Sequence, residues 1–441
     1  MKIAILGAGI SGLAVARTLL EGGFDPRDVH VLESAPVAGG LCASKTVDGF
    51  TYDVAGGHIL YSKDKAAMEW MKAQAGGPAA FVERRRETKI RFGDRWVHYP
   101  FENGLGDLPA EANYDCLKGY VEAWHLRKTQ GGAAPADFAG WVRWRFGEGI
   151  ARHFMDPYNA KIWKRPLSEL TSDWVAGRVP DAPIDDVLKS SIGIRTEGYT
   201  HQSIFYYPLD GGFQAITDGF ARAIGSCLRL STRVERVQKR GSRYLVNGEE
   251  FDAVVSTLAL HDLPALVEGL PSGLADEMRA LSYNSLYTLL IALDRPTHPN
   301  LSWIYLPHDE QGPANRVTYM SNYSPHLAPP GKNSLMCEVT YASDARPPGP
   351  ETERAILQGL ERAGLLKRNE VLFTDHSLVR LAYIVYDPPH ARRRAAAIEW
   401  LEGQGIHPLG RFGRYDYDNS DQCVIKARAL GARLLERARR G

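Results

Sequence analysis

Three glycines near the N-terminus have the spacing of a dinucleotide-binding turn. Gly7, Gly9 and Gly12 form a Gly-x-Gly-x-x-Gly pattern between an apolar run and a segment with helical periodicity. The first glycine permits a tight turn, the second lets a pyrophosphate approach the backbone, and the third lets helix and strand pack closely. The start of the helix, which includes Ser11, offers free N–H groups to phosphate oxygens. The alternative is a glycine-rich turn in an unrelated α/β fold.

An acidic residue follows where such folds contact a ribose. Glu33 ends a second apolar run, 21 residues after Gly12. Its carboxylate can accept hydrogen bonds from ribose hydroxyls, which selects FAD or NAD over NADP. Gly39 and Gly40 come soon after this run, at a place where flavoproteins bring the backbone to the cofactor. The sequence therefore favours FAD.

The C-terminal part of the chain adds a second predicted contact with the cofactor. Residues 409–427 pair a glycine turn with a helix start, an arrangement that can close over a flavin ring. The alternative is a surface turn before an ordinary helix. The further positions assigned to the cofactor site are Gly57, Val234, Gly410, Arg411 and Asn419.

The elements that position the glycine turn form a β-α-β opening. Residues 2–6 and 29–33 are short apolar runs that predict buried strands, and residues 12–22 have helical periodicity. This opening is typical of a doubly wound sheet. We predict an α/β fold, with a Rossmann-type FAD-binding domain, a helical insertion and an antiparallel-sheet substrate domain.

The rest of the chain changes in character several times. Helical signals dominate residues 105–200, and residues 228–258 return to β-structure with a hairpin turn at Asn247–Gly248. Residues 285–342 alternate like antiparallel strands, and residues 421–440 predict a basic helix. We expect an FAD-binding domain from residues 1–62, 205–262 and 390–441, a helical substrate insertion from 105–204, and an antiparallel-sheet substrate domain from 63–104 and 263–389.

Composition excludes several classes of protein. The 441 residues carry 53 basic and 52 acidic side chains, a balance that argues against nucleic acid as the main partner. No apolar run approaches the roughly 20 residues that span a membrane. Five scattered cysteines without metal-ligand spacing indicate a reducing compartment and no bound metal. Glycines break the N-terminal apolar run and no cleavage site follows it, so we expect a cytoplasmic protein.

Nine motifs beyond the glycine turn carry a resemblance to a known family. They occur in this order: VLESAPVAGGLCAS, DVAGGHILYS, WVHYPFENG, FMDPYNAKIWKRP, WVAGRVP, FYYPLDGG, SWIYLP, RVTYMSNYSP and GRFGRYDYDNSDQ. At these motifs the chain resembles the UDP-galactopyranose mutase family, its eukaryotic-type branch more than its bacterial one. Flavin amine oxidases and protoporphyrinogen oxidases are wider relatives, which share the fold but lack most of the later motifs.

The resemblance implies an unusual use of the flavin. In this family the N5 atom of reduced FAD attacks the anomeric carbon of a nucleotide sugar and displaces the diphosphate. The sugar opens on the flavin and closes again with a different ring size, so a pyranose and a furanose interconvert without net redox change. The implied substrate is a nucleoside-diphosphate hexose, and the FAD must first be reduced. NAD(P)H is the implied reductant, although the chain holds no second Gly-x-Gly-x-x-Gly pattern.

The resemblance assigns catalytic roles to three residues. Arg178 and Arg316 would hold the diphosphate, which planar guanidinium groups bind through two oxygens at once. His58 follows two glycines in a loop that the family places beside the isoalloxazine ring. The hydroxyl donors beside the diphosphate would be Tyr305, Tyr383 and Tyr417. For each residue the alternative is structural: an arginine paired with a nearby acid, a loop histidine, or a packed tyrosine.

The remaining substrate contacts implied by the resemblance are mostly aromatic. They are Tyr99, Phe101, Glu102, Tyr158, Asn159, Trp163 and Gln202. Glu102 stands where the family has a glutamine that reads uracil, so it suits a base edge with N–H donors, such as guanine or cytosine. Gln202 stands where the family has an asparagine near the sugar. For the aromatic residues the alternative is a core at a domain junction.

Two other functions remain open at this stage. An oxidoreductase of the amine oxidase or protoporphyrinogen oxidase type would need an apolar cage and no paired phosphate ligands. A protein that binds flavin or nucleotide sugar without catalysis would hold its arginines apart. The sequence sets no oligomeric state.

Overall fold

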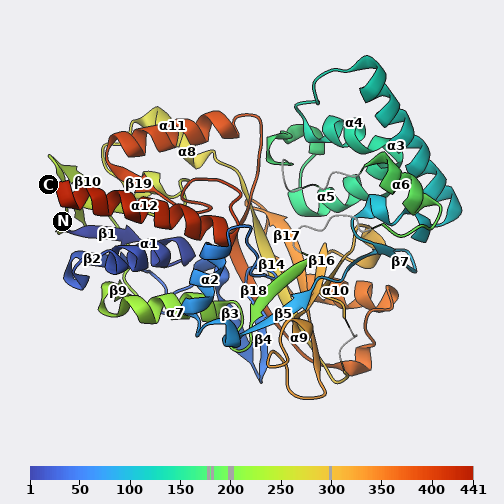
Figure 1. Cartoon of the computed structure of the whole chain (residues 1–441), viewed down its shortest axis with the longest axis horizontal. Helices are drawn as coiled ribbons and strands as arrows, with labels where there is room; N and C mark the ends of the chain where they lie inside the picture. The colour runs from blue at the N-terminus through green and yellow to red at the C-terminus, as the bar shows by residue number, and fades with distance from the viewer. Residues whose placement is uncertain (176–178, 180–182, 197–202, 297–299, 441) are drawn as a thin grey trace.

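The computed structural model describes the whole chain except residues 176–178, 180–182, 197–202, 297–299 and 441. Three parts are visible in Figure 1. A parallel sheet with its helices lies at the left with both termini, an antiparallel sheet lies in the middle, and a group of helices lies at the upper right.

The parallel sheet is assembled from three distant stretches of the chain. Its strand order is β19-β13-β1-β2-β9, and every neighbouring pair is parallel. The strands are β1 (Ile3–Leu6), β2 (Val29–Leu32), β9 (Leu228–Arg229), β13 (Ala253–Ser256) and β19 (Ile406–Pro408). All residues of β1, β2 and β13 are buried, because helices or a small sheet cover both faces.

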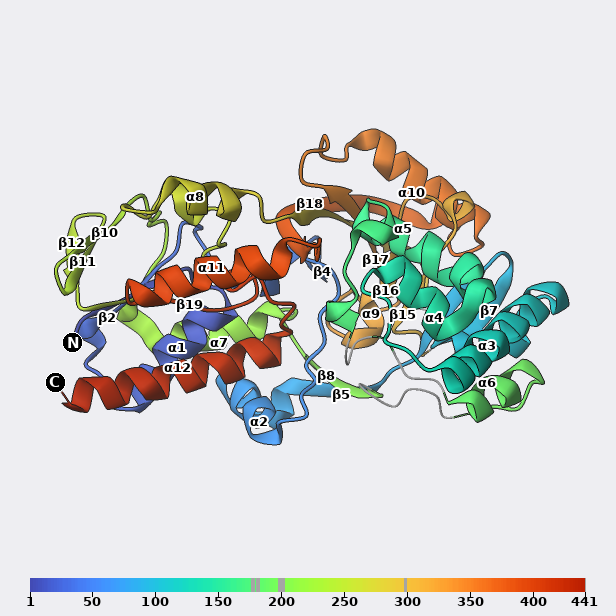
Figure 2. The same cartoon turned by 90° about the horizontal axis from the view of Figure 1, so that it is seen from above.

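Alternate residues of β1 belong to two different cores. Ile3 and Ile5 pack in a cluster with α1, α7 and α12, whereas Ala4 and Leu6 pack with α8, α11 and the small β10–β12 sheet. Figure 2 shows α8 and α11 on the other side of the sheet from α1 and α12. These helices are α1 (Ile10–Glu21), α7 (Gln214–Ile224), α8 (Ser272–Arg279), α11 (His390–Gly403) and α12 (Ser420–Arg440).

The predicted hairpin at Asn247–Gly248 is confirmed. It joins β11 (Arg243–Val246) to β12 (Glu249–Phe251), and both turn residues have positive φ, as a two-residue hairpin turn requires. Strand β10 (Val237–Arg240) completes this small sheet. The prediction of β-structure throughout 228–258 was too broad, because no strand lies between β9 and β10. There the chain turns at Ser231, which has a φ of 50°, and runs along the cavity described below.

The seven-stranded sheet has the order β18-β14-β17-β16-β15-β6-β7. All its pairs are antiparallel except β15 with β6. Helix α10 (Pro350–Arg362) packs on one face through a separate apolar cluster. The strands are β6 (Thr88–Phe92), β7 (Arg95–His98), β14 (Tyr283–Leu293), β15 (Trp303–Tyr305), β16 (Arg316–Tyr319), β17 (Asn333–Ala342) and β18 (Val371–Ile384).

The helical part lies where the sequence predicts helices. It contains α3 (Ala110–Gln130), α4 (Phe138–Ile150), a π-helical turn (Ala151–Met155), α5 (Asp156–Trp163) and α6 (Ile184–Ser191). Helices α3 and α4 approach closely at Gly149, where a Cβ would lie 2.1 Å from the carbonyl oxygen of Asp115. The connecting elements are β3 (Ser44–Val47), β4 (Phe50–Asp53), α2 (Lys65–Gln74), β5 (Phe81–Arg85), β8 (Ile204–Pro208) and α9 (Met320–Tyr323).

One buried lysine ties the helical part to the antiparallel sheet. Lys161 on α5 is 5% exposed, and its ammonium group donates to four backbone carbonyls. The acceptors are Leu306 at 2.9 Å, His308 at 2.7 Å, Gly312 at 2.8 Å and Ala314 at 3.3 Å. The charge is therefore compensated by backbone dipoles from the segment that joins β15 to β16.

Replacing Lys161 with methionine should lower the unfolding free energy by about 3 kcal/mol or more, because buried carbonyls would lose their donor. Thermal and urea unfolding would measure this. The matched control is Lys118→Met on α3, where the ammonium pairs with Glu122 in solvent and should contribute little. Equal stability of the two variants would contradict the role of Lys161.

Candidate functional site

A cavity of about 1510 Å³ lies at the carboxyl ends of the parallel strands. The parallel sheet contributes Gly7, Glu33 and Thr257, which follow β1, β2 and β13, and the antiparallel sheet contributes Tyr305 and Arg316. Ligands of open α/β sheets bind at this edge. The volume exceeds the ~300–1,000 Å³ typical of a pocket for one small ligand, so it suits a dinucleotide together with a second molecule.

The glycine turn has the geometry that each glycine predicts. Gly7 has a φ of +100°, and a Cβ on Gly12 would lie 2.0 Å from the Gly7 carbonyl oxygen, so helix and strand require a glycine there. Gly9 borders the cavity, and a Cβ on it would meet nothing within 4 Å. The second glycine loop packs beside it, because the N–H of Gly39 donates to Ala8 at 2.9 Å.

Glu33 lies at one end of the cavity. Its carboxylate accepts the N–H of Ala8 at 2.9 Å and that of Ala35 at 2.8 Å. These two bonds hold the carboxylate beside the glycine turn, and Glu33 itself lines the cavity. Val234 lines the cavity too, and its contact with the cofactor stays a prediction.

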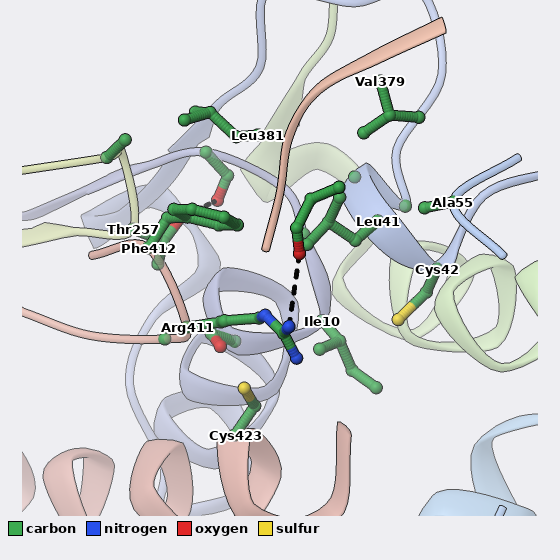
Figure 3. Close-up of a pocket in the computed structure, with 18 of the residues that line it drawn as sticks. Ile10, Leu41, Cys42, Ala55, Thr257, Val379, Leu381, Arg411, Phe412 and Cys423 are labelled. Carbon is green, nitrogen blue, oxygen red and sulfur yellow. Dashed lines mark hydrogen bonds between the residues drawn. The ribbon is translucent and has the colours of Figure 1, made fainter. Parts of the chain in front are cut away.

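The C-terminal segment closes the cavity from another side. Gly410, Arg411 and Asn419 all line it. The Arg411 guanidinium donates to the Ala382 carbonyl at 3.2 Å and lies 4.0 Å from the centre of the Tyr417 ring. Its buried Nε has no hydrogen-bond partner among the described residues. Figure 3 shows how both ends of the chain meet here, with Ile10 and Leu41 beside Arg411, Phe412 and Cys423.

An ion pair between a half-buried arginine and a fully buried glutamate lies in the part of the cavity nearest the antiparallel sheet. Arg316 on β16 faces Glu338 on β17, and its Nε donates to Glu338 Oε1 at 2.6 Å. Burial opposes the charge of Arg316, but Glu338 and then Tyr383 and Tyr305 outweigh it and raise the pKa of the guanidinium well above its usual value. Arg316 is therefore permanently charged, although its side chain is only 22% exposed.

Tyrosines surround this arginine. Tyr305, Tyr383 and Tyr417 line the same cavity as Arg316, together with Tyr323. Burial raises the pKa of Tyr305 and of Tyr383, so both phenols keep their protons at neutral pH. Each is thus a hydrogen-bond donor that can face an anion.

His58 lies in the loop that enters the cavity after β4. Its N–H donates to Asp53 Oδ2 at 3.0 Å, and its ring stacks on Phe213 at a centroid distance of 5.1 Å. Gly57 and His58 both line the cavity. Burial lowers the pKa of His58, so the imidazole is neutral at pH 7 and can donate and accept one hydrogen bond each.

The predicted aromatic contacts divide into two groups. Tyr99 and Tyr158 do not line the cavity themselves but contact Tyr305, with ring centroids 5.4 and 5.0 Å away. Phe101 is 1% exposed and stacks on Phe154, away from the cavity lining. Phe101 therefore packs in the core, and its contact with a substrate stays a prediction.

The motif DPYNAKIW is also used inside the helical core. Asn159 donates to the Met155 carbonyl at 2.7 Å and accepts the Trp163 indole N–H at 3.1 Å. Trp163 is 3% exposed and packs against Trp174. Neither side chain lines the cavity, so their contact with a substrate stays a prediction. Arg178 and Gln202 lie outside the described residues.

Glu102 is an unusual group for its surroundings. It is 5% exposed, and its Oε1 has no hydrogen-bond partner among the residues that the structure describes. Burial raises the pKa of this carboxyl to about 7. It is not part of the cavity lining, so its predicted contact with a base stays a prediction.

Sequence reasoning missed two buried carboxylates, Asp53 and Glu338. Asp53 is fully buried and accepts four donors: Ser44 Oγ, Tyr207 OH and the N–H groups of His58 and Phe213. Glu338 is fully buried beside Arg316. The available signal was an acid in an otherwise apolar strand, SLMCEVTY, because a charge survives burial only when it is paired.

Comparisons with known proteins agree with this geometry. Residues 145–402 match the flavin containing amine oxidoreductase family, and residues 5–73 match the NAD(P)-binding Rossmann-like domain. Because the first match covers more than half of the chain, the protein belongs to the flavin containing amine oxidoreductase family. The α/β fold with a parallel sheet and an antiparallel-sheet domain is confirmed.

Among solved structures, the chain is similar to a reduced UDP-galactopyranose mutase. The TM-score is 0.90 and the identity 27%, over 99% of this chain and 95% of that one. A putative protoporphyrinogen oxidase from Exiguobacterium sp. 255-15 shares the fold, with a TM-score of 0.72 and 18% identity over 99% of both chains. A zeta-carotene-forming phytoene desaturase from Myxococcus xanthus is 45% identical over 53 residues, which are 12% of this chain and 10% of that relative.

The Rossmann-like domain and the family imply FAD. The residues present fit it: Gly9 leaves room for a pyrophosphate, Glu33 presents carboxylate oxygens, and Arg411 Nε is a buried donor that lacks an acceptor. Within the described part of the chain, no helix is long and apolar enough to cross a membrane. The same residues contain no cluster of three or more His, Cys, Asp or Glu side chains arranged to hold a metal ion.

Gly9→Ala should separate cofactor binding from folding. The φ of Gly9 is −71° and its Cβ position is open, so the apoprotein should melt as the wild type does. The methyl group would occupy the approach of the pyrophosphate and should weaken FAD binding by about tenfold or more. Flavin titration and thermal melting of the apoprotein measure the two effects. In contrast, Gly12→Ala should prevent folding; a Gly9→Ala variant with full FAD affinity would exclude this site.

Glu102→Gln should change how stability depends on pH. The folded-state pKa of about 7 exceeds the ordinary 4.5, so the wild type loses stability as pH rises from about 4.5 to 7. The amide does not titrate, and at pH 8 the variant should be more stable by up to about 3 kcal/mol. At pH 5 the difference should be small. Urea unfolding at both pH values measures it, and a pH-independent difference would contradict the buried, unpaired carboxyl.

Proposed function

We propose that this protein is a flavin-dependent nucleotide-sugar mutase, which interconverts the pyranose and furanose forms of a nucleoside-diphosphate hexose. One observation carries the proposal: the cavity that holds the dinucleotide turn also holds a half-buried, charged arginine among protonated tyrosines. Such a pocket suits a diphosphate next to a flavin. The 27% identity with a reduced UDP-galactopyranose mutase over nearly the whole chain supports it.

The chemistry requires a leaving group that departs and returns. Reduced FAD, when bound, supplies an electron-rich centre that can attack the anomeric carbon. Arg316 binds phosphate oxygens and stabilises the negative charge that grows on the diphosphate. The Tyr305 and Tyr383 hydroxyls donate to the same anion, and because they are fixed in a buried site they need no reorganisation during the reaction.

The residues also keep the diphosphate close after the bond breaks. Arg316 is held by Glu338 and by the Gly57 carbonyl, so its guanidinium has one orientation. Pre-oriented groups of this kind reduce the entropy cost of recapture. The His58 ring is neutral, stacks on Phe213, and can form hydrogen bonds with the bound cofactor. It adds no positive charge that would compete with Arg316 for the diphosphate.

We further propose NAD(P)H as the reductant and the cytoplasm as the compartment. The chain has one Gly-x-Gly-x-x-Gly turn, which FAD would occupy. A reduced nicotinamide cofactor would therefore dock transiently in the nucleotide-sugar part of the cavity, where Arg316 can bind its pyrophosphate.

The second candidate is an FAD-dependent oxidoreductase. The match to the flavin containing amine oxidoreductase family over residues 145–402 favours it. Such an enzyme would reduce its own flavin with an amine or a porphyrinogen as substrate. A charged arginine in the cavity is a poor neighbour for a cationic amine, because like charges repel in a buried site.

The deciding experiment offers UDP-, GDP-, CDP- and dTDP-hexoses to the dithionite-reduced protein with cyanoborohydride present. We expect one nucleotide series to yield released flavin that is heavier by one hexose, as measured by mass spectrometry. That series identifies the base. Arg316→Lys should lower kcat/KM about 100-fold, because an ammonium lacks the planar fork.

The matched control is Arg392→Lys, whose side chain pairs with Glu277 on the surface and should leave the rate unchanged. Unmodified flavin across the panel, together with flavin reduction by amines or porphyrinogens, would replace the mutase proposal with the oxidoreductase.

A further inference from the structure

The carboxylate of Glu338 serves two partners at once. Its Oε1 accepts Arg316 Nε at 2.6 Å and the N–H of Gly57 at 3.2 Å. The Arg316 guanidinium in turn donates to the Gly57 carbonyl at 3.3 Å. The N–H and the carbonyl of Gly57 are therefore bound by the two members of one ion pair.

The neighbouring residues leave this arrangement little freedom. A Cβ on Gly56 would lie 2.8 Å from Glu338 Oε2, so the loop and the carboxylate are in close contact. The next amide, that of His58, is bound by the second buried carboxylate, Asp53. Two consecutive N–H groups of the loop thus donate hydrogen bonds to two carboxylates, one from β4 and one from β17.

The Arg316 charge is also compensated before any ligand arrives. Glu338 is fully buried, and its Oε2 has no hydrogen-bond partner among the described residues. The ion pair that Arg316 makes among the described residues is with Glu338, and the tyrosines around the guanidinium are neutral. An anion that binds Arg316 must therefore share the guanidinium with Glu338.

We propose that Glu338 is a positioning residue that orients Arg316 and the Gly56–His58 loop together, and that it weakens diphosphate binding in doing so. This inference rests on the proposed function, because it takes the ligand of Arg316 to be a diphosphate. A carboxylate next to the anion site lowers ground-state affinity by charge repulsion. The same carboxylate keeps the guanidinium in the orientation that the departing diphosphate needs. Glu338 therefore lowers the affinity for the diphosphate and raises the rate of turnover.

The test measures binding and turnover separately in two variants of the FAD-loaded protein. Glu338→Gln keeps the shape and the acceptor for Gly57 but removes the charge. Glu338→Asp keeps the charge but shortens the reach by one methylene. Inorganic pyrophosphate is the probe, because it engages Arg316 without any contact to a base or a sugar. Calorimetric titration of the oxidised protein gives its Kd.

Glu338→Gln should bind pyrophosphate about tenfold more tightly and still turn over at least about tenfold more slowly. Glu338→Asp should also turn over slowly but should not bind pyrophosphate more tightly. This split between affinity and rate separates positioning from general damage to the fold, which would weaken binding in both variants. The melting temperature of each variant reports on such damage.

Two results would overturn the proposal in different ways. Pyrophosphate that binds the wild type, but binds Glu338→Gln with equal or lower affinity, would exclude the competition by Glu338 and leave the mutase proposal standing. A wild-type protein that binds no pyrophosphate would exclude the diphosphate site at Arg316, and the role of Glu338 would fall with it.

Discussion

The structure around the cavity depends on two buried carboxylates that lie beneath one loop. Asp53 belongs to the β3–β4 hairpin, and Glu338 belongs to the antiparallel sheet. Each binds one of two consecutive N–H groups, those of His58 and Gly57. Burying a carboxylate is unfavourable unless donors compensate it. The loop amides, Arg316 and the hydroxyls of Ser44 and Tyr207 supply those donors, so the hairpin, strand β8 and the antiparallel sheet must all meet at this loop for both carboxylates to be satisfied.

The same burial decides the chemistry of the cavity. It raises the pKa of the tyrosines, so they remain donors, and it lowers the pKa of His58, so the imidazole remains neutral. Arg316 stays charged because Glu338 compensates it. Low dielectric surroundings make each of these groups more effective towards an anion than the same group would be in water. The part of the site around Arg316 thus combines a permanent cation with neutral donors.

The sequence predicted those elements correctly whose interacting residues lie close together in the chain. The β-α-β opening, the hairpin at Asn247–Gly248 and the C-terminal helix were predicted correctly, because their signals are local: apolar periodicity, turn residues and glycine spacing. The chain between Arg229 and Val237 was not, because its path follows the cavity rather than its own strand propensity. In the candidate site, Gly7, Glu33, His58 and Arg316 were found through motifs, and the structure brings all four to one cavity.

The sequence by itself determined the class of cofactor site, since the glycine pattern and Glu33 act through the backbone of one short segment. It also marked the residue types able to bind a diphosphate. Only the tertiary structure decided which of them line the cavity and which pack in a core. Asn159 and Trp163 lie in the helical core because α5 turns them inward, Phe101 stacks on Phe154 in the same core, and Tyr305 joins the cavity because β15 pairs beside Arg316. Asp53 and Glu338 acquired their roles in the same way, because a carboxylate's partners come from strands and loops far away in the chain.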